Sequence, residues 1–293
     1  MNPYRADVVG SMLRPQYLLE ARESYAGGNI SHADFKAIED QAVDECVDIQ
    51  KRAGVDVVTD GEMRRAVFAS QLAQSCDGFD RVQNNEVDWF TLDGRVERSP
   101  VTVGLVSKIK RRRHLSSEEY VYLRAKTNQP RKITLPSPTM YAYYWVPGVS
   151  NAAYPTTDAY MADIVDILRD EVSELVRLGA EYIQFDAPEF GMIIDPHQQE
   201  WFGRKGFRPE RMLHDGIAMI DAIVTILRWS SDCISAAATT PVATWRGAVM
   251  IPSLRSRFTP KHSACSLNMT TIAQGTLEHC AVCRTIRPLS LDW

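Results

Sequence analysis

The sequence predicts an α/β fold in which parallel strands alternate with crossover helices, in the manner of a (β/α)8 TIM barrel. Strand-like and amphipathic helical segments alternate without hairpin signals between them. The 293 residues cover the ~250 that such a barrel needs. Three strand-like segments end in polar residues, at Ser11, at Asp60 with Glu62, and at Asp186 with Glu189. The carboxyl ends of parallel strands meet at one edge, where active sites usually lie.

The first strand–helix–strand unit starts with residues 6–11, a strand-like segment that enters a glycine turn. Ser31 then begins a capping box, and apolar residues at helical spacing follow until Gly54 ends the helix. Cys46 lies on the apolar face of this helix, which predicts a buried structural thiol. Residues 55–59 predict the next strand, and the acidic turn with Asp60 and Glu62 directly follows it.

The middle of the chain departs from the simple repeat. Residues 77–100 are polar and irregular, which predicts an excursion from the barrel. Residues 101–106 predict a further strand, and Ser116 with Glu119 has the spacing of a second capping box. A strand at 132–138 then leaves through two prolines.

The next unit begins with Asp158, the expected N-cap of an amphipathic helix that closes at Gly179. A short apolar strand follows and ends in Asp186, and residues 209–226 form another amphipathic helix. We therefore expect about five parallel strands before Trp229, which is five-eighths of a barrel.

Composition limits the classes of function. Apolar residues make up 45% of the chain, enough for a large core, and the net charge of −4 gives no reason to expect nucleic acid or an anionic membrane as a partner. No apolar run approaches the ~20 residues that span a bilayer, and the first residues lack the apolar stretch of a signal peptide. We expect a soluble cytoplasmic protein whose six cysteines are not paired in disulfides.

The composition changes near Trp229. Residues 1–228 carry a net charge of −7, whereas residues 229–293 carry +3 and hold four of the six cysteines. The tail also loses helical periodicity. We expect a β/α barrel portion over 1–228 and an aberrant, poorly ordered tail over 229–293.

Four motifs together resemble the cobalamin-independent methionine synthase family, of the catalytic C-terminal domain type. The resemblance runs from about Arg5 to Ile226 and implies a barrel of the methionine synthase/uroporphyrinogen decarboxylase-like type, incomplete after about residue 228. The family moves a methyl group from 5-methyltetrahydrofolate to the thiol of homocysteine. The motifs are Val8-Val9-Gly10-Ser11 with Arg14-Pro15, the segment from Asp56 to Glu62, Leu135-Pro136-Ser137-Pro138, and the segment from Ile183 to Pro188.

The resemblance implies roles for individual residues. Ser11 and Glu62 fall where the family holds the amino acid, and Asp186 falls where it contacts the substrate amine. Trp145 falls near a tryptophan that stacks on folate, and Glu189 is the candidate general acid beside Asp186. The family also binds zinc, through a His-x-Cys pair, a Glu and a later Cys, and zinc deprotonates a thiol that ordinarily has a pKa of ~8.5.

The tail lacks the family's later motifs as written, but it encodes them in another frame. When codons are read one base over, the junctions from Asp232 onward spell L-H-I-C-R-G-N, which contains the zinc-binding H-x-C pattern. The same frame turns residues 247–252 into G-G-Y-D and residues 266–275 into L-E-Y-D-D-D-R-S-G. We therefore expect a single frameshift between about Val224 and Trp229, and no metal ligands in the chain as written, although His279, Cys280 and Cys283 have metal-like spacing.

Three alternatives stay open beside an impaired methionine synthase. The first is zinc-dependent alkyl transfer to another thiol, such as coenzyme M. The second is a non-catalytic, degenerate paralogue that only binds an amino acid or pterin. The third is a metal-free decarboxylase of the same barrel superfamily, which would bind a porphyrin. Each of the first two predicts small-molecule partners only, and the sequence does not predict an oligomeric state.

Overall fold

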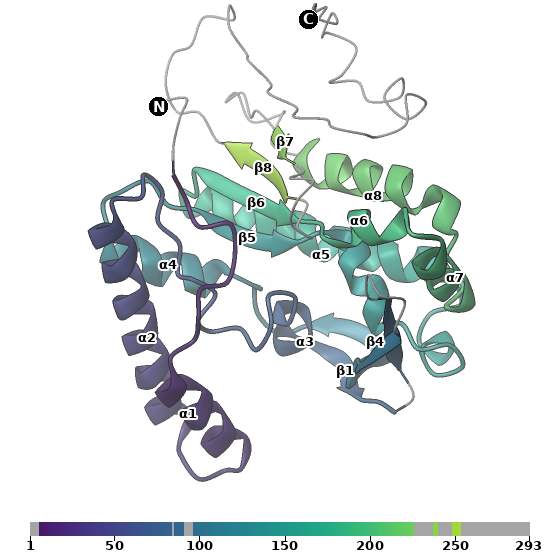
Figure 1. The fold of residues 1–293 in the computed structure, drawn as a ribbon, viewed down its shortest axis with the longest axis horizontal. Helices are drawn as coiled ribbons and strands as arrows, with labels where there is room; N and C mark the ends of the chain where they lie inside the picture. Colours follow the sequence, from purple (N-terminus) through teal and green to yellow (C-terminus); the bar gives the residue numbers. More distant parts are fainter. Residues whose placement is uncertain (1–5, 84, 91–95, 226–236, 240–247, 253–293) are drawn as a thin grey trace, which may run out of the picture.

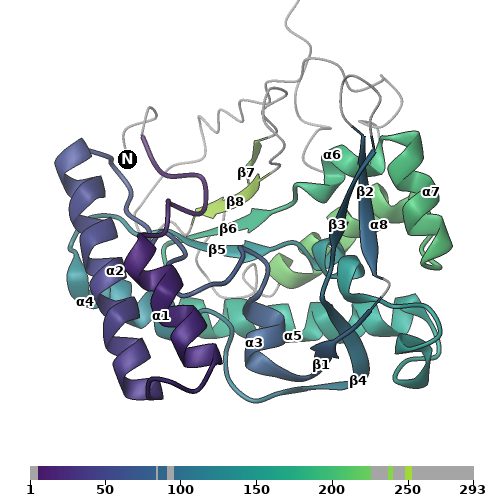
Figure 2. The same ribbon diagram turned by 60° about the horizontal axis from the view of Figure 1, so that its bottom comes forward.

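The computed structural model describes residues 6–83, 85–90, 96–225, 237–239 and 248–252. Helices surround a central sheet on its outer side, and a two-stranded arm extends from the body (Figures 1 and 2). In chain order the elements are α1 (Gln16–Ala26), α2 (His32–Ala53), α3 (Gln71–Ser75), β1 (Cys76–Arg81), β2 (Glu86–Phe90), β3 (Val96–Pro100), β4 (Val103–Arg111), α4 (Ser117–Lys126), β5 (Ile133–Pro136), 3-10 turns at Pro138–Tyr144 and Ser150–Ala152, α5 (Thr157–Arg177), β6 (Tyr182–Asp186), α6 (Glu189–Ile193), α7 (Pro196–Arg204), α8 (Pro209–Val224), β7 (Ala237–Thr239) and β8 (Ala248–Pro252).

The first two strand-like segments join the sheet through single parallel bridges. Asp7 pairs with Val57, and Val58 pairs with Arg131 just before β5. β5 then pairs in parallel with β6, with Ile133 opposite Ile183. The chain order of these four positions is therefore also their spatial order, as the first half of a barrel requires.

The central strands of the sheet are buried on both faces. Every residue of β5 and β6 is buried, which is typical of parallel strands covered on both faces. Helix α5 covers them with Ile164, Leu168 and Val172, each 0% exposed. Burying a side chain of this size contributes about 1.5–3 kcal/mol, so this layer stabilises the central sheet.

The predicted helix after Ser31 is confirmed. The Ser31 hydroxyl accepts a hydrogen bond from the Asp34 N–H, and Gly54 ends α2 with a left-handed φ of 73°. Cys46 is buried on the inner face of α2, as predicted, and burial raises the pKa of its thiol to about 12.

Two predicted caps are wrong. Ser116 precedes α4 but does not cap it with its side chain. Its hydroxyl is instead hydrogen-bonded to the Gln71 side chain, and Glu119 binds an arginine. Helix α5 begins two residues earlier than expected because Thr156, rather than Asp158, accepts the hydrogen bond from an N–H of the first turn.

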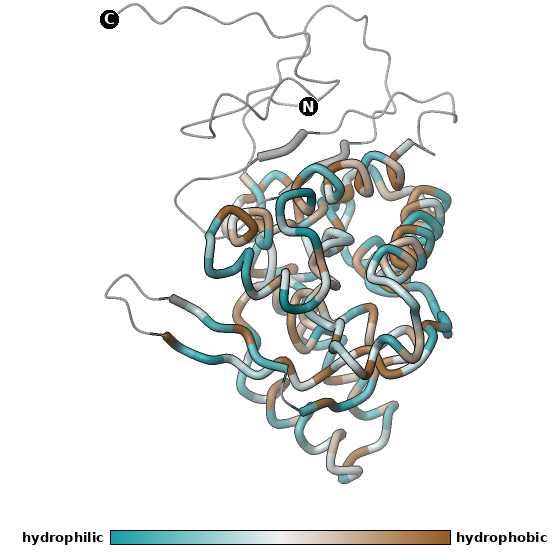
Figure 3. Tube along the Cα trace, turned by 90° about the vertical axis from the view of Figure 1, so that its right-hand side faces the viewer, coloured by the Kyte–Doolittle hydropathy of each residue, from teal (hydrophilic) through white to brown (hydrophobic). Residues whose placement is uncertain are grey.

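The prediction of five parallel strands is also wrong. Residues 101–106 fall at the start of β4, which pairs antiparallel with β1. β2 and β3 continue this ribbon as a second antiparallel pair, with Glu86 opposite Pro100. Figure 3 shows the arm reaching away from the body, with mostly hydrophilic residues along it. The insertion therefore separates α3 from α4 without adding a strand to the barrel.

Two short strands from the tail complete the sheet, in the order β5-β6-β8-β7. β8 runs antiparallel to β6, with Asp186 opposite Ala248, and β7 runs antiparallel to β8. The rest of the tail lies outside the described residues, as do His279, Cys280 and Cys283. The expectation that 229–293 is out of frame is therefore not tested by the fold.

Across the described ranges, we find no helix that is both long and apolar enough to cross a membrane.

Candidate active site

The acidic turn after the second strand position places Glu62 at the centre of the site. Gly61 and Glu62 both adopt left-handed backbone conformations, with φ of 64° and 58°. A positive φ is costly for a residue with a side chain, and such strain is often found at functional sites. Two local hydrogen bonds hold the turn, from Gly61 N–H to Thr59 Oγ1 and from Glu62 N–H to Asp60 Oδ1, both at 3.0 Å.

Only glycine fits at position 61. A Cβ there would collide with the Cys46 sulfur, and the left-handed φ disfavours every other residue type. The buried thiol of α2 therefore packs directly under the turn. This contact gives Cys46 a structural role in supporting Glu62.

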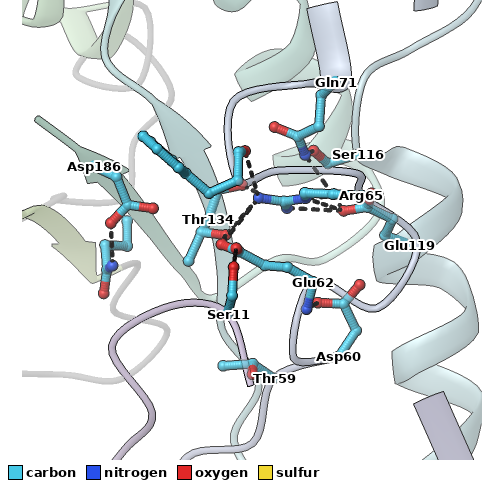
Figure 4. A network of polar contacts seen from close by, with 12 residues as sticks. Ser11, Thr59, Asp60, Glu62, Arg65, Gln71, Ser116, Glu119, Thr134 and Asp186 are labelled. Carbon is cyan, nitrogen blue, oxygen red and sulfur yellow. Dashed lines mark hydrogen bonds and ion pairs between the residues drawn. The ribbon is translucent and has the colours of Figure 1, made fainter. Parts of the chain in front are cut away.

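Three side chains donate hydrogen bonds to the Glu62 carboxylate (Figure 4). The Ser11 hydroxyl binds Oε2. Thr134 Oγ1, on β5, lies 2.6 Å from Oε1, and Arg65 Nη1 lies 3.1 Å from the same oxygen. Ser11 and Glu62 are thus brought together from the first two strand positions, as the sequence predicted for the shared edge.

Arg65 is a buried residue of the site to which the sequence analysis assigned no role. Its side chain is 0% exposed and binds Glu119 Oε2 through Nη2 at 2.8 Å and through Nε at 3.2 Å. Nη2 also donates to the Thr134 carbonyl at 2.9 Å. Burial alone would lower the pKa of Arg65, but the charges of Glu119 and Glu62 raise it. Arg65 therefore stays charged and fixes the orientation of Glu62.

Asp186 ends β6 on the same edge and is 9% exposed. Its Oδ1 accepts a hydrogen bond from Gln184 Nε2 at 2.5 Å. Burial, together with the negative charge of Glu62, raises the pKa of Asp186 to about 7. The charges of the two carboxylates therefore act on one another, and Ser11 lies against Glu62 (Figure 4).

Glu189 occupies a different environment from the one the sequence suggested. It is 0% exposed, in the first turn of α6. The Ser137 hydroxyl and Thr139 Oγ1, the latter at 2.6 Å, donate to Oε1. Oε2 has no hydrogen-bond partner within the part of the chain that the structure describes. These two hydroxyl partners place the carboxyl outside the Ser11–Glu62 network, and burial raises the pKa of Glu189 to about 7.

Trp145 is a core residue in this structure. It is 2% exposed, and its ring centroid lies 5.7 Å from that of Tyr160. Its carbonyl accepts a hydrogen bond from Lys205 Nζ at 2.6 Å. A flat ligand needs an exposed ring face on which to stack, and the described structure leaves almost none of this side chain exposed. The folate-stacking role of Trp145 stays a prediction.

The described residues do not fit a zinc site. Within them, no group of three or more His, Cys, Asp or Glu side chains is placed to hold a metal ion. Cys46 and Cys76 are both buried, and burial raises the pKa of their thiols to about 12 and about 11. A zinc ligand is a thiolate, which these environments disfavour.

Comparison with known proteins gives a consistent result. The family model "Cobalamin-independent synthase, Catalytic domain" matches residues 5–202. A methionine synthase of Sulfurisphaera tokodaii is 31% identical over 66% of the chain, and a 5-methyltetrahydropteroyltriglutamate--homocysteine methyltransferase of a Synechococcus strain is 24% identical over 80%. The chain spans 53% and 32% of these two relatives.

A solved structure shares the fold. It is that of the putative vitamin-B12 independent methionine synthase from Listeria monocytogenes, which superposes with a TM-score of 0.55 at 23% sequence identity. The match covers 76% of the chain and 61% of that structure. The expected fold class, an α/β fold of the methionine synthase barrel type, is thus confirmed for the part of the barrel that the chain supplies.

Proposed function

The chain belongs to the cobalamin-independent methionine synthase family, and from this premise we propose that the Ser11–Glu62–Asp186 edge binds the amino acid of a methyl transfer to a thiol. The amino acid is homocysteine or the methionine formed from it, and the donor is a methyl-folate. The observation that carries the proposal is Glu62, a carboxylate held by three donors on a strained backbone at the edge where its family binds substrate.

The chemistry of the edge suits an α-ammonium group. The Glu62 carboxylate, together with Asp186 in its ionised form, supplies negative charge in a poorly hydrated site, where an ion pair is stronger than in water. Ser11 adds a hydroxyl that donates to Glu62 and has lone pairs left for a ligand N–H. The Arg65–Glu119 pair keeps this arrangement rigid before a ligand arrives, which reduces the ordering cost of binding.

The transfer step itself needs an activated thiol. A free thiol with a pKa of ~8.5 is a weak nucleophile at neutral pH. Because the described residues do not fit a zinc site, we propose that the chain as written retains binding and has lost most turnover. The frameshift between about Val224 and Trp229 accounts for that loss.

Calorimetric titration tests the binding proposal. We expect L-methionine and L-homocysteine to bind, and an analogue that lacks the amino group to bind at least tenfold more weakly. Glu62→Gln should weaken the binding of L-methionine by about 10- to 100-fold, because a hydrogen bond to a charged group contributes about 1.5–3 kcal/mol. Glu20→Gln, an exposed glutamate on α1, is the matched control and should change nothing. Equal binding of the analogue without an amino group, such as a coenzyme M-like thiol, would refute the assignment.

Sequencing the gene across codons 220–240 tests the frameshift. A one-base correction that restores the L-H-I-C-R-G-N segment supports it, and the corrected protein should then bind zinc. A gene whose shifted frame does not encode these motifs refutes it.

A further inference from the structure

A buried lysine lies behind Asp186, on the interior side of the sheet. Lys132 directly precedes β5 and is 0% exposed. Its Nζ binds Asp7 Oδ2 at 3.1 Å, the Val8 carbonyl at 2.5 Å and Gln184 Oε1 at 2.8 Å. The ammonium thus joins the first strand position, β5 and β6, and its charge is balanced by Asp7.

Lys132 determines which way the Gln184 amide faces. An ammonium group only donates hydrogen bonds, so the amide oxygen of Gln184 must face it. The amide nitrogen must then face the opposite side, where it donates to Asp186 Oδ1 at 2.5 Å and to the Val9 carbonyl at 2.6 Å. The reversed amide would place an NH2 group against an NH3⁺ group and a carbonyl oxygen against a carboxylate. The polarity of the row Asp7–Lys132–Gln184–Asp186 is therefore fixed.

The row has a direct effect on Asp186. The charged groups that act on this carboxyl are Glu62, Arg65 and Lys132. Glu62 disfavours its ionisation, whereas Arg65, Lys132 and the Gln184 amide favour it. In the part of the chain that the structure describes, Gln184 is the one side chain that donates a hydrogen bond to the Asp186 carboxylate. It binds only one of the two carboxylate oxygens, Oδ1.

We propose that Lys132 and Gln184 are positioning residues that favour the carboxylate form of Asp186, with one oxygen committed to the protein and the other offered to the ammonium group of an amino acid. The role in binding rests on the proposed function. The effect on Asp186 itself does not, because it exists in the ligand-free protein.

The decisive variant is Gln184→Glu. It has the same shape, and one of its oxygens still accepts from Lys132, so the buried ammonium keeps its partner. The other oxygen now faces Asp186 Oδ1 and the Val9 carbonyl, where the amide donated before. Gln199→Glu on α7 is the matched control. Its amide donates to the Ile193 carbonyl at 2.9 Å, away from Asp186.

Two measurements separate the inference from the proposed function. The first is a pH titration of the aspartate carboxyl carbons by NMR in the ligand-free protein, with the Asp186 signal assigned from Asp186→Asn. We expect Gln184→Glu to raise the pKa of Asp186 by at least one and Gln199→Glu to leave it unchanged. The second is the Kd of L-methionine at pH 7, which should rise at least tenfold in Gln184→Glu alone.

The outcomes are distinct. An unchanged Asp186 titration in Gln184→Glu overturns the positioning role, whatever the ligand data show. If the wild-type protein binds no amino acid but the titration shifts as expected, the proposed function fails and the effect on Asp186 stands. Lys132→Met, which leaves the amide free to reverse, gives a second test: its Asp186 titration should also move upward, and a titration identical to wild type would contradict the fixed polarity of the row.

Discussion

Replacing the buried Glu189 should make the stability of the protein less dependent on pH. Glu189 is fully buried, and its pKa is about 7 against a usual value of 4.5. Below pH 4.5 the carboxyl is protonated in both the folded and the unfolded states. Between 4.5 and 7 the unfolded chain ionises first, so the free energy of unfolding falls as the pH rises. Above pH 7 the folded protein carries the full cost of an ionised carboxylate in the core.

The size of the effect follows from that pKa difference. Moving from pH 5 to pH 8 should cost the wild-type protein about 2.5 kcal/mol through this one group. Glu189→Gln removes the titration and keeps the acceptor for the Ser137 and Thr139 hydroxyls. Its new NH2 group takes the place of Oε2, which lacks a donor among the described residues. An unpaired amide there costs about 1–3 kcal/mol at every pH, so only the pH-dependent part identifies the carboxyl.

The assay is urea denaturation at half-unit steps from pH 5 to pH 8. The difference in unfolding free energy between Glu189→Gln and wild type should move by about 2.5 kcal/mol in favour of the variant across this range. Glu20→Gln on the exposed face of α1 is the control and should give a flat difference. A flat difference for Glu189→Gln would mean that the buried carboxyl titrates normally, and the argument from burial would be refuted.

Two further substitutions test the support of Glu62, each by the same denaturation assay. Arg65→Met leaves Glu62 and Glu119 buried without their common cation, and should cost about 3–5 kcal/mol; a loss below 1 kcal/mol would contradict the role of this pair. Gly61→Ala should cost clearly more than Gly28→Ala. Both glycines have a positive φ, which costs an alanine about 1 kcal/mol, but only at Gly61 does a new Cβ meet a buried thiol. Equal losses of unfolding free energy in the two variants would exclude the collision.

Local sequence rules predicted the elements that local forces determine. The helix from His32 to Ala53 follows from its Ser31 cap, its apolar spacing and Gly54, and all three features act within one or two turns. The strand from Tyr182 to Asp186 follows in the same way from a short apolar run after Gly179. The strand at 101–106 was assigned to the wrong sheet because its partner, β1, is set by long-range pairing that the segment itself does not encode.

The sequence predicted only part of the site, because only some of its contacts can be inferred from local sequence patterns. Ser11 and Glu62 could be paired in advance because both end strands of one parallel sheet, and the structure joins them. Glu119 could not be paired with Arg65 in advance. Ser116 and Glu119 have the spacing of a capping box, and nothing in the local sequence shows that Arg65 attracts the acid. The available signal was the Arg64-Arg65 pair directly after the acidic turn, because a cation that becomes buried there needs a second acid from elsewhere. Trp145 shows a related limit, because an aromatic residue at a strand exit has the same local sequence whether it lines a site or packs in the core, as Trp145 does beside Tyr160.

The direction of β8 bears on what the tail can contribute. In a (β/α)8 barrel the strand after α8 runs parallel to β6, because the helix between them returns the chain to its starting end. β8, which pairs with β6 on the side opposite β5, runs antiparallel to it, so the carboxyl end of β8 lies at the opposite edge from Ser11, Glu62 and Asp186. In the shifted frame, by contrast, the L-H-I-C-R-G-N segment starts at the Asp232–Cys233 junction, soon after α8 ends at Val224, which suits a short connection into a parallel strand. The proposed frameshift therefore predicts that the corrected chain has a parallel strand here, and that a metal bound at its end shares the edge with Glu62.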